Sequence, residues 1–139
     1  MAVNKTIHKN HEYCGITKLS MASSERKYDL EDRLIGFAVL NIETVNNLPV
    51  DKVGNHLGQQ LLRSGTSPAL NYGEAMSAES RKDFIHKFKI VLKELRETMI
   101  CIKILLKISY LNSDNQIGKE CNELIAIFVK SLATAEENF

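Results

Sequence analysis

Apolar residues recur every three or four positions along most of the chain after residue 28, the spacing that lines one side of an α-helix. Polar and proline-containing interruptions divide this pattern into four segments. We expect helices over Leu30–Leu48, from Asp51 to Glu79, from Ser80 towards Asn112, and after a turn at Asn112–Asn115. No stretch alternates with a period of two for long enough to predict a sheet. Four amphipathic helices with short connections predict an all-α fold, an antiparallel up-down-up-down four-helix bundle.

The first segment has recognisable start and stop signals. Asp29 is the expected N-cap, and Asp32 places a further negative charge in the first turn, where the helix dipole favours it. Asn46, Asn47 and Pro49 are expected to end the helix. The predicted buried stripe consists of Leu34, Ile35, Ala38, Ile42 and Val45.

The second segment is unusually rich in small residues. Pro68 predicts a kink or a break about two-thirds of the way along it. Glycine inside a helix costs about 1 kcal/mol relative to alanine, so another interaction must offset it. We expect close approach of another helix, from the same chain or from a second subunit, along Gly54, Gly58, Ser64, Gly65, Ser67 and Ala69.

The third segment is the most regular, and two neighbouring apolar rows predict that it contacts more than one helix. Ser80 or an adjacent residue is its expected cap. The first row contains Phe84, Phe88, Val91, Leu95, Thr98, Ile102 and Leu105, and the second contains Ile85, Leu92, Met99 and Leu106. The fourth helix should be capped by Ser113 or Asp114. Its predicted inward side is Ile117, Cys121, Leu124, Ile125, Phe128, Val129 and Leu132.

Residues 1–27 differ from the rest because they are polar and weakly periodic, which predicts an N-terminal arm beside a bundle of residues 28–139. His8, His11 and Cys14 have a spacing that suits metal coordination on a helix. Three such residues in a polar arm more often occur by chance, so we predict no metal site. Elsewhere no pair of Glu-x-x-His motifs, phosphate-binding glycine loop or nucleophile elbow occurs. The sequence therefore predicts neither an enzyme nor a cofactor.

Composition places the protein in a reducing, aqueous setting. Its three cysteines form no CxxC motif, and 44% of its 139 residues are hydrophobic. The N-terminus lacks the apolar core of a secretory signal. The longest apolar run, Met99–Leu106, is interrupted by Lys103 and is too short to cross a bilayer. We expect a cytoplasmic protein with no membrane partner.

A row of cationic residues follows one side of the third helix, although the formal net charge of the whole chain is only +1. From Arg81 to Tyr110 the chain carries eight cationic and three acidic residues. Cations spaced by one helical turn can follow a phosphate backbone. The predicted nucleic-acid-binding residues are Lys82, His86, Lys89, Lys93, Arg96, Lys103 and Lys107, with Ile100 interrupting them.

A second interpretation of this row stays open. The cations can form a solvated face, or they can meet the acidic helices of a neighbouring subunit through Glu31, Asp32, Glu43, Glu120 and Glu123. No aromatic residue is interleaved along the row, so base stacking is not predicted. The two interpretations are a non-specific nucleic-acid-binding surface and a structural or protein-interaction scaffold.

The central part of the sequence resembles the proteins encoded within intervening sequences of bacterial 23S ribosomal RNA genes, formerly called ribosomal proteins. The resemblance is carried by HLGQQLLRSGTSPALNYGEA from His56 to Ala75 and AESRKDFIHKFKIVLKELRET from Ala78 to Thr98. It extends more weakly over residues 28–135.

This resemblance implies a left-handed up-down bundle that assembles into a ring-like homopentamer and has no known catalysis. It also implies possible association with RNA or DNA, because a related group acts as pentameric, basic accessory factors to reverse transcriptases. Within the matched stretch we expect Arg63, Asn71 and Glu74 to be structural, the alternative being that Arg63 joins the cationic surface. They would satisfy backbone groups freed by Pro68 or pair with Arg96 and Glu97.

Overall fold

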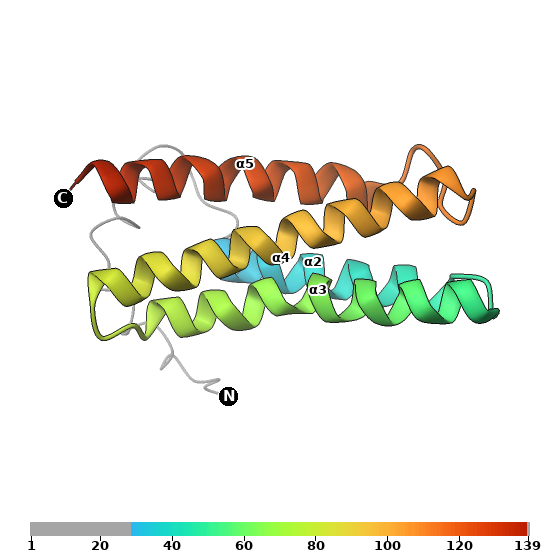
Figure 1. Ribbon diagram of the computed structural model, residues 1–139, viewed down its shortest axis with the longest axis horizontal. Coiled ribbons are helices and arrows are strands. Elements are labelled where there is room, and N and C mark those ends of the chain that lie inside the picture. Colours follow the sequence, from blue (N-terminus) through green and yellow to red (C-terminus); the bar gives the residue numbers. More distant parts are fainter. Residues whose placement is uncertain (1–28, 139) are drawn as a thin grey trace, which may run out of the picture.

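The computed structural model describes residues 29–138 of the chain. They form four α-helices: α2 (Leu30–Asn46), α3 (Lys52–Met76), α4 (Arg81–Lys107) and α5 (Gln116–Glu137). Successive helices lie side by side, and the chain reverses direction at each connection (Figure 1). No strand occurs between residues 29 and 138. The prediction of an all-α four-helix bundle is confirmed, whereas its left-handed sense stays a prediction.

Each helix begins at a side-chain cap. The oxygens of Asp29, Asp51, Ser80 and Asn115 accept a hydrogen bond from the backbone N–H three residues later, at 2.7–3.1 Å. Such bonds satisfy one of the amide donors left open in a first helical turn. The caps predicted for α2 and α4 are therefore confirmed. The prediction of Ser113 or Asp114 for α5 is wrong, because the Oδ1 atom of Asn115 reaches the Gly118 amide.

The first two helices end earlier than predicted. The predicted ends were Leu48 and Glu79, whereas α2 ends at Asn46 and α3 at Met76. In both helices the next backbone N–H bonds back to the carbonyl three residues earlier, which tightens the last turn. Pro68 lies inside α3 and does not break it.

The core lies along the middle of the bundle and contains an aromatic cluster. Phe84 and Phe88 of α4 have ring centroids 4.3 Å apart, and Phe88 lies 5.0 Å from Phe128 of α5. Tyr72 of α3 meets Phe128 edge-on at 6.3 Å. All seven residues of the predicted first row of α4 are buried. The cluster therefore joins three helices, as the wide apolar stripe of α4 predicted.

The predicted buried stripe of α2 is partly wrong. The fully buried residues are Leu34, Phe37 and Asn41, whereas Ile35 is 48% and Ile42 41% exposed. The helix is rotated relative to the prediction because the polar Asn41 side chain, and not Ile42, faces α3. Val129 of α5 was also predicted to point inward and is 44% exposed.

Glycines allow α2 to approach α3 closely. A Cβ atom on Gly65 would lie 2.2 Å from the Cγ atom of Asn41, so no side chain fits there. On Gly58 it would lie 3.3 Å from a methyl group of Val45. The close helix that the small residues of α3 predicted is therefore α2 of the same chain.

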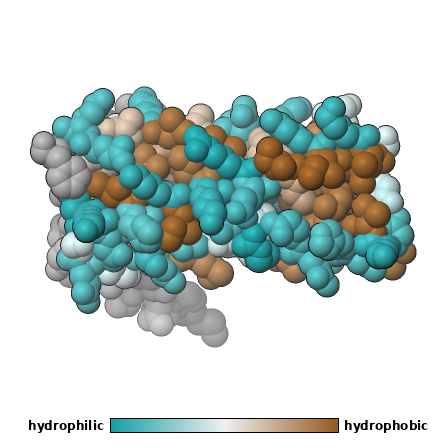
Figure 2. Space-filling view, in the orientation of Figure 1, coloured by the Kyte–Doolittle hydropathy of each residue, from teal (hydrophilic) through white to brown (hydrophobic). Residues whose placement is uncertain are grey.

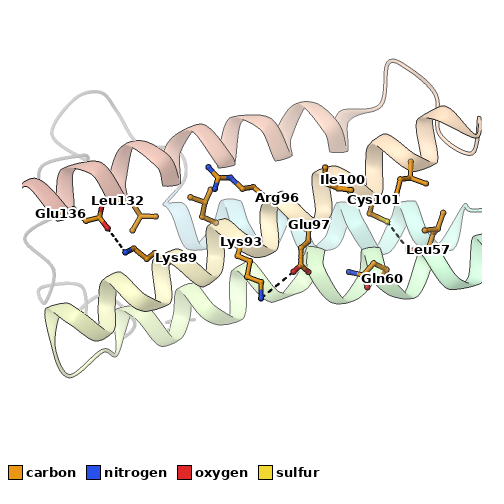
Figure 3. Close-up of a pocket in the computed structure, with 12 residues that line it drawn as sticks. Leu57, Gln60, Lys89, Lys93, Arg96, Glu97, Ile100, Cys101, Leu132 and Glu136 are labelled. Carbon is orange, nitrogen blue, oxygen red and sulfur yellow. Dashed lines mark hydrogen bonds and ion pairs between the residues drawn. The ribbon is translucent and has the colours of Figure 1, made fainter.

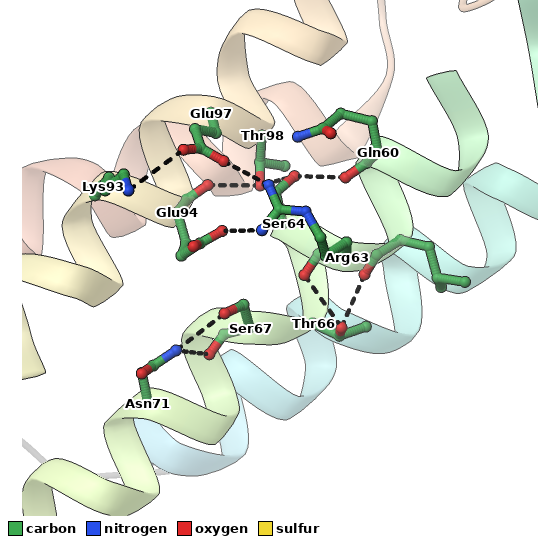
Figure 4. A network of polar contacts seen from close by, with 11 residues as sticks. Gln60, Arg63, Ser64, Thr66, Ser67, Asn71, Lys93, Glu94, Glu97 and Thr98 are labelled. Carbon is green, nitrogen blue, oxygen red and sulfur yellow. Dashed lines mark hydrogen bonds and ion pairs between the residues drawn. The ribbon is translucent and has the colours of Figure 1, made fainter. Parts of the chain in front are cut away.

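Polar groups join α3 to α4 (Figure 4). The hydroxyl groups of Thr98 and Ser64 lie 3.0 Å apart, and both are fully buried. The guanidinium of Arg63 donates to the carboxylates of Glu94 at 3.3 Å and Glu97 at 2.7 Å. The hydrogen bond that Arg63 donates to Glu97 raises the pKa of the Arg63 guanidinium.

The structural roles expected around Pro68 are confirmed in part. Arg63 pairs with Glu97 as expected, and Lys87 pairs with Glu74 at 2.6 Å. Asn71 does not reach the carbonyl of Ser64, which Pro68 deprives of its amide donor. Its Nδ2 atom donates instead to the carbonyl and the hydroxyl of Ser67.

Candidate nucleic-acid interface

The outward side of α4 is open along the bundle. α4 packs against α3 on one side and α5 on the other, and the backbones of α3 and α5 do not approach each other closely, although Tyr72 and Phe128 meet through their rings in the core. α4 therefore turns a continuous strip of its surface away from the core. All the residues predicted for nucleic-acid binding lie on this strip and are exposed: Lys82, His86, Lys89, Lys93, Arg96, Lys103 and Lys107.

The cationic row extends along almost the whole of α4. Lys82 and Lys107 are separated by 25 residues, which corresponds to about 38 Å of helix. At 3.4 Å per base pair this length matches about eleven base pairs of duplex DNA. A straight helix can therefore present several of these cations to phosphates at the same time.

A groove of about 710 Å³ lies over the middle of this strip, between α3 and α5 (Figure 3). Its floor is apolar, with Leu92, Ile100 and Ile104 from α4, Leu57 from α3 and Leu132 from α5. Its edges are polar and carry Gln60, Lys89, Lys93, Arg96, Glu97 and Glu136. The predicted cations are thus placed beside an apolar surface.

The two ends of the strip differ in character. Figure 2 shows a broad hydrophobic surface over the end of this face where the carboxyl-terminal half of α4 lies, hydrophilic surface over its middle, and smaller hydrophobic patches towards the other end. Ile100 is 57% and Ile104 43% exposed. The amino-terminal half carries Lys82, His86 and Lys89 without a large exposed aliphatic residue beside them on the helix.

Few of the cations are neutralised by other residues of the described part of the chain. The Nζ atom of Lys89 lies 2.9 Å from Glu136 of α5, and that of Lys93 lies 4.0 Å from Glu97. Between residues 29 and 138, the other members of the row form no ion pair. Exposed pairs of this kind contribute little to stability, so they leave the cations available to phosphates.

Of the five acidic residues that could pair with the cationic row of a neighbouring subunit, two already form ion pairs within the chain. Glu120 and Glu123 of α5 bind the Arg33 guanidinium of α2, with Glu120 at 2.7 Å. The hydrogen bond that Arg33 donates to Glu120 raises the pKa of the Arg33 guanidinium. In the described part of the chain, Glu31, Asp32 and Glu43 of α2 form no ion pair and are exposed.

The cysteines that the structure describes are not suited to nucleophilic chemistry. Burial raises the pKa of the Cys121 thiol to about 12 and also raises that of Cys101. Both thiols therefore stay protonated and donate to backbone carbonyls, of Leu95 and Leu57 respectively. The third cysteine, Cys14, lies outside the described residues together with His8 and His11.

The part of the chain from residue 29 to residue 138 offers neither a metal site nor a membrane-spanning helix. No group of three or more histidine, cysteine, aspartate or glutamate side chains there is arranged to hold a metal ion. None of the helices in this part of the chain has the length and apolar character needed to cross a membrane.

Sequence reasoning located the row but not the groove beside it. Leu57 and Leu132 complete the groove from other helices, and no pattern within α4 identifies them. Ile104 follows Ile100 by one helical turn and so lies on the same side of α4 as the row. The sequence spacing alone could therefore have predicted that Ile104 is exposed.

The fold and this mixed strip define a class of small helical-bundle proteins that expose a cationic row beside an apolar groove. Residues 26–130 match the family of 23S rRNA-intervening sequence proteins. The match covers more than half of the chain, so the protein belongs to this family.

A solved structure supports the same assignment. A protein of unknown function from the S23 ribosomal protein family of Bacteroides thetaiotaomicron VPI-5482 is 30% identical, with a TM-score of 0.71. The similarity covers 75% of this chain and 98% of that one. No curated protein is significantly similar in sequence to this chain.

Proposed function

We propose that the protein is a non-catalytic homo-oligomer that binds RNA or DNA non-specifically through the outward side of α4. The observation that carries the proposal is the exposure of the whole cationic row on the strip between α3 and α5. The proposed contacts are Lys82, His86, Lys89, Lys93, Arg96, Lys103 and Lys107. The family resemblance supports self-association, with a ring of five copies as the expected form.

The chemistry of the row favours binding to the phosphate backbone. Lysine and arginine side chains release counterions when they meet phosphates, and this interaction carries no sequence information. No tyrosine, phenylalanine or tryptophan lies on the exposed side of α4, so the described surface offers no platform for stacked bases. We therefore expect similar affinities for unrelated sequences.

The test is a binding titration across a salt series with the variant Lys82→Glu/Lys89→Glu/Lys93→Glu. The wild type should bind RNA or DNA with an affinity that falls steeply as salt rises. The variant should lose most of this affinity, and the slope of log affinity against log salt should fall by about three, one for each phosphate contact.

The matched control changes the same number of charges on other helices. Lys52→Glu/Lys119→Glu/Lys130→Glu alters exposed residues of α3 and α5 and lowers the net charge by the same amount. This control should keep its affinity for nucleic acid to within a few-fold. Equal losses in both variants would contradict a defined surface on α4.

A structural or protein-interaction scaffold without nucleic-acid binding is the alternative. It is favoured by the exposed Ile100 and Ile104 within the groove, because adjoining apolar side chains often mark protein contacts. If the wild type binds neither RNA nor DNA at low salt, the scaffold is the correct description.

A further inference from the structure

The outer side of α2 carries an apolar row that no other part of the described chain covers. Ile35, Val39 and Ile42 are 48%, 47% and 41% exposed. At about 100° per residue they lie within about 60° of one another on the helix. Arg33, which reaches α5, points to the opposite side, and Asn41 points towards α3. Among residues 29–138 the row is therefore a continuous face without a partner.

Acidic residues border this row. Glu31, Asp32 and Glu43 lie within about 80° of Val39 around the helix and are exposed. They form no ion pair within residues 29–138. The outer side of α2 is thus an apolar row with negative edges.

The groove on α4 has the complementary character. Its apolar floor includes the exposed Ile100 and Ile104, and Lys93 and Arg96 line its edge. The two acidic residues on its edges are already paired within the chain, Glu97 with Arg63 and Glu136 with Lys89. Lys103 lies on the same side of the helix. The groove therefore matches the α2 row in both properties, because apolar surface can meet apolar surface while the charges at the edges are of opposite sign.

We propose that the α2 row of one copy packs into the carboxyl-terminal part of the α4 groove of a second copy. This inference rests on the proposed self-association and names the two surfaces that meet. Because the surfaces differ, the contact is head-to-tail, and a rotation that closes turns such repeated contacts into a ring. Lys82, His86 and Lys89 lie towards the other end of α4 and stay outside the contact. Of the proposed phosphate contacts, the interface between copies therefore covers Lys93, Arg96 and Lys103 and leaves the amino-terminal cations of α4 open.

Two variants test the contact from its two sides. Ile35→Lys/Val39→Lys places cations on the α2 row, where they would face the cations of the groove. Ile100→Glu/Ile104→Glu places carboxylates in the groove, where they would face the acids of α2. The changed residues are exposed within one copy, so circular dichroism should show unchanged helix content. By light scattering, each variant alone should fall to the mass of a single chain.

Mixing the variants is the decisive step. The groove of the first variant and the α2 row of the second are both intact, so the mixture should recover a mass above that of a single chain. Val50→Lys is the matched control, because Val50 is 94% exposed and lies outside both surfaces. It should keep the mass of the wild type.

Each other outcome overturns the inference in a recognisable way. Loss of mass only in the α2 variant would indicate that the α2 row meets itself. Unchanged mass in both would place the contact elsewhere while leaving the proposed oligomer intact. A wild type with the mass of one chain would remove self-association altogether, whereas nucleic-acid binding is measured independently.

Should either variant fail to fold, crosslinking of the wild type gives the same information. A carbodiimide joins adjacent carboxylates and lysines, and a mixture of isotopically light and heavy chains identifies bonds between copies. Bonds from Glu31, Asp32 or Glu43 to Lys93 or Lys103 of another copy are expected. Bonds between copies that join other surfaces only would overturn the proposal.

Discussion

The two contacts that α3 makes within the bundle differ in chemistry. Towards α2 it presents Gly58 and Gly65, and the backbones approach so closely that Asn41 fills the space where a side chain would stand. Towards α4 it presents Ser64 and Arg63, which bond to Thr98, Glu94 and Glu97.

This difference determines what the bundle leaves on its outside. The α2 contact uses none of the acidic residues of α2, so Glu31, Asp32 and Glu43 remain outside together with an apolar row. The α4 contact uses the acidic residues of α4 that face α3, Glu94 and Glu97. The cations of α4 consequently dominate its outward side. The two kinds of contact on α3 therefore help to leave an acidic outer surface on α2 and a cationic outer surface on α4.

The largest expected effect comes from filling the space between α2 and α3. Gly65→Val would place methyl groups against Asn41 and force the helices apart. We expect a loss of about 3 kcal/mol in the free energy of unfolding, measured by chemical denaturation. Gly73→Ala is the control, because a Cβ atom there meets nothing within 4 Å. It should raise stability by about 0.5–1 kcal/mol through better helix propensity. A tolerated Gly65→Val would show that the contact is not close.

A smaller effect is expected from the buried hydroxyl pair between α3 and α4. Thr98→Val keeps the shape of the side chain but removes its bonds to Ser64 and to the carbonyl of Glu94. The expected loss is about 1 kcal/mol in the free energy of unfolding. Thr134→Val is matched, since Thr134 bonds only to the carbonyl of Lys130 in its own helix. Equal losses in the two variants would mean that the bond across the helices contributes nothing.

The smallest effect concerns the hydrogen bond that joins the start of α3 to the end of α4. The Tyr110 hydroxyl donates to the Asp51 carboxylate at 2.5 Å. The Gly54 amide and, next, this hydroxyl lower the pKa of Asp51 below its ordinary value of 3.8. A lowered carboxyl pKa stabilises the fold above pH 3.8, and this contribution is lost as the pH falls through the folded-state value.

The measurement for this bond compares Tyr110→Phe with the wild type over a range of pH. The variant should melt slightly lower than the wild type at neutral pH. The difference should shrink as acid protonates Asp51. A difference that is independent of acidity would show that the tyrosine acts through packing and not through the carboxylate.

Periodicity identified the helices well because each is long and has a regular apolar stripe. The stripe of α4 was correct at every position of its first row, since those residues face a core formed by both neighbours. In α2 the stripe was misplaced because Asn41 is polar and was therefore not expected in the core. Only Gly65, which lies opposite Asn41 in the folded chain, makes the burial of Asn41 possible. That pairing links residues 24 positions apart and leaves no local signal.

The candidate surface was predictable to a similar degree. The cationic row is a property of one helix, so its spacing is visible in the sequence. Which apolar residues lie beside it depends on how α3 and α5 flank α4, as Leu57 and Leu132 show. The outer row of α2 was hidden for the same reason, because Ile35 and Ile42 were assigned to the core.

Lysine reactivity in the assembled protein tests the central claim most directly. The protein is labelled with an amine-reactive reagent, with and without RNA, and modification is measured at each lysine by mass spectrometry. The account predicts that Lys82 and Lys89 react freely in the oligomer alone and become protected when RNA is added, while Lys119 and Lys130 do not change. Protection of Lys82 and Lys89 before any RNA is present would contradict it, because neighbouring subunits would then already occupy the surface.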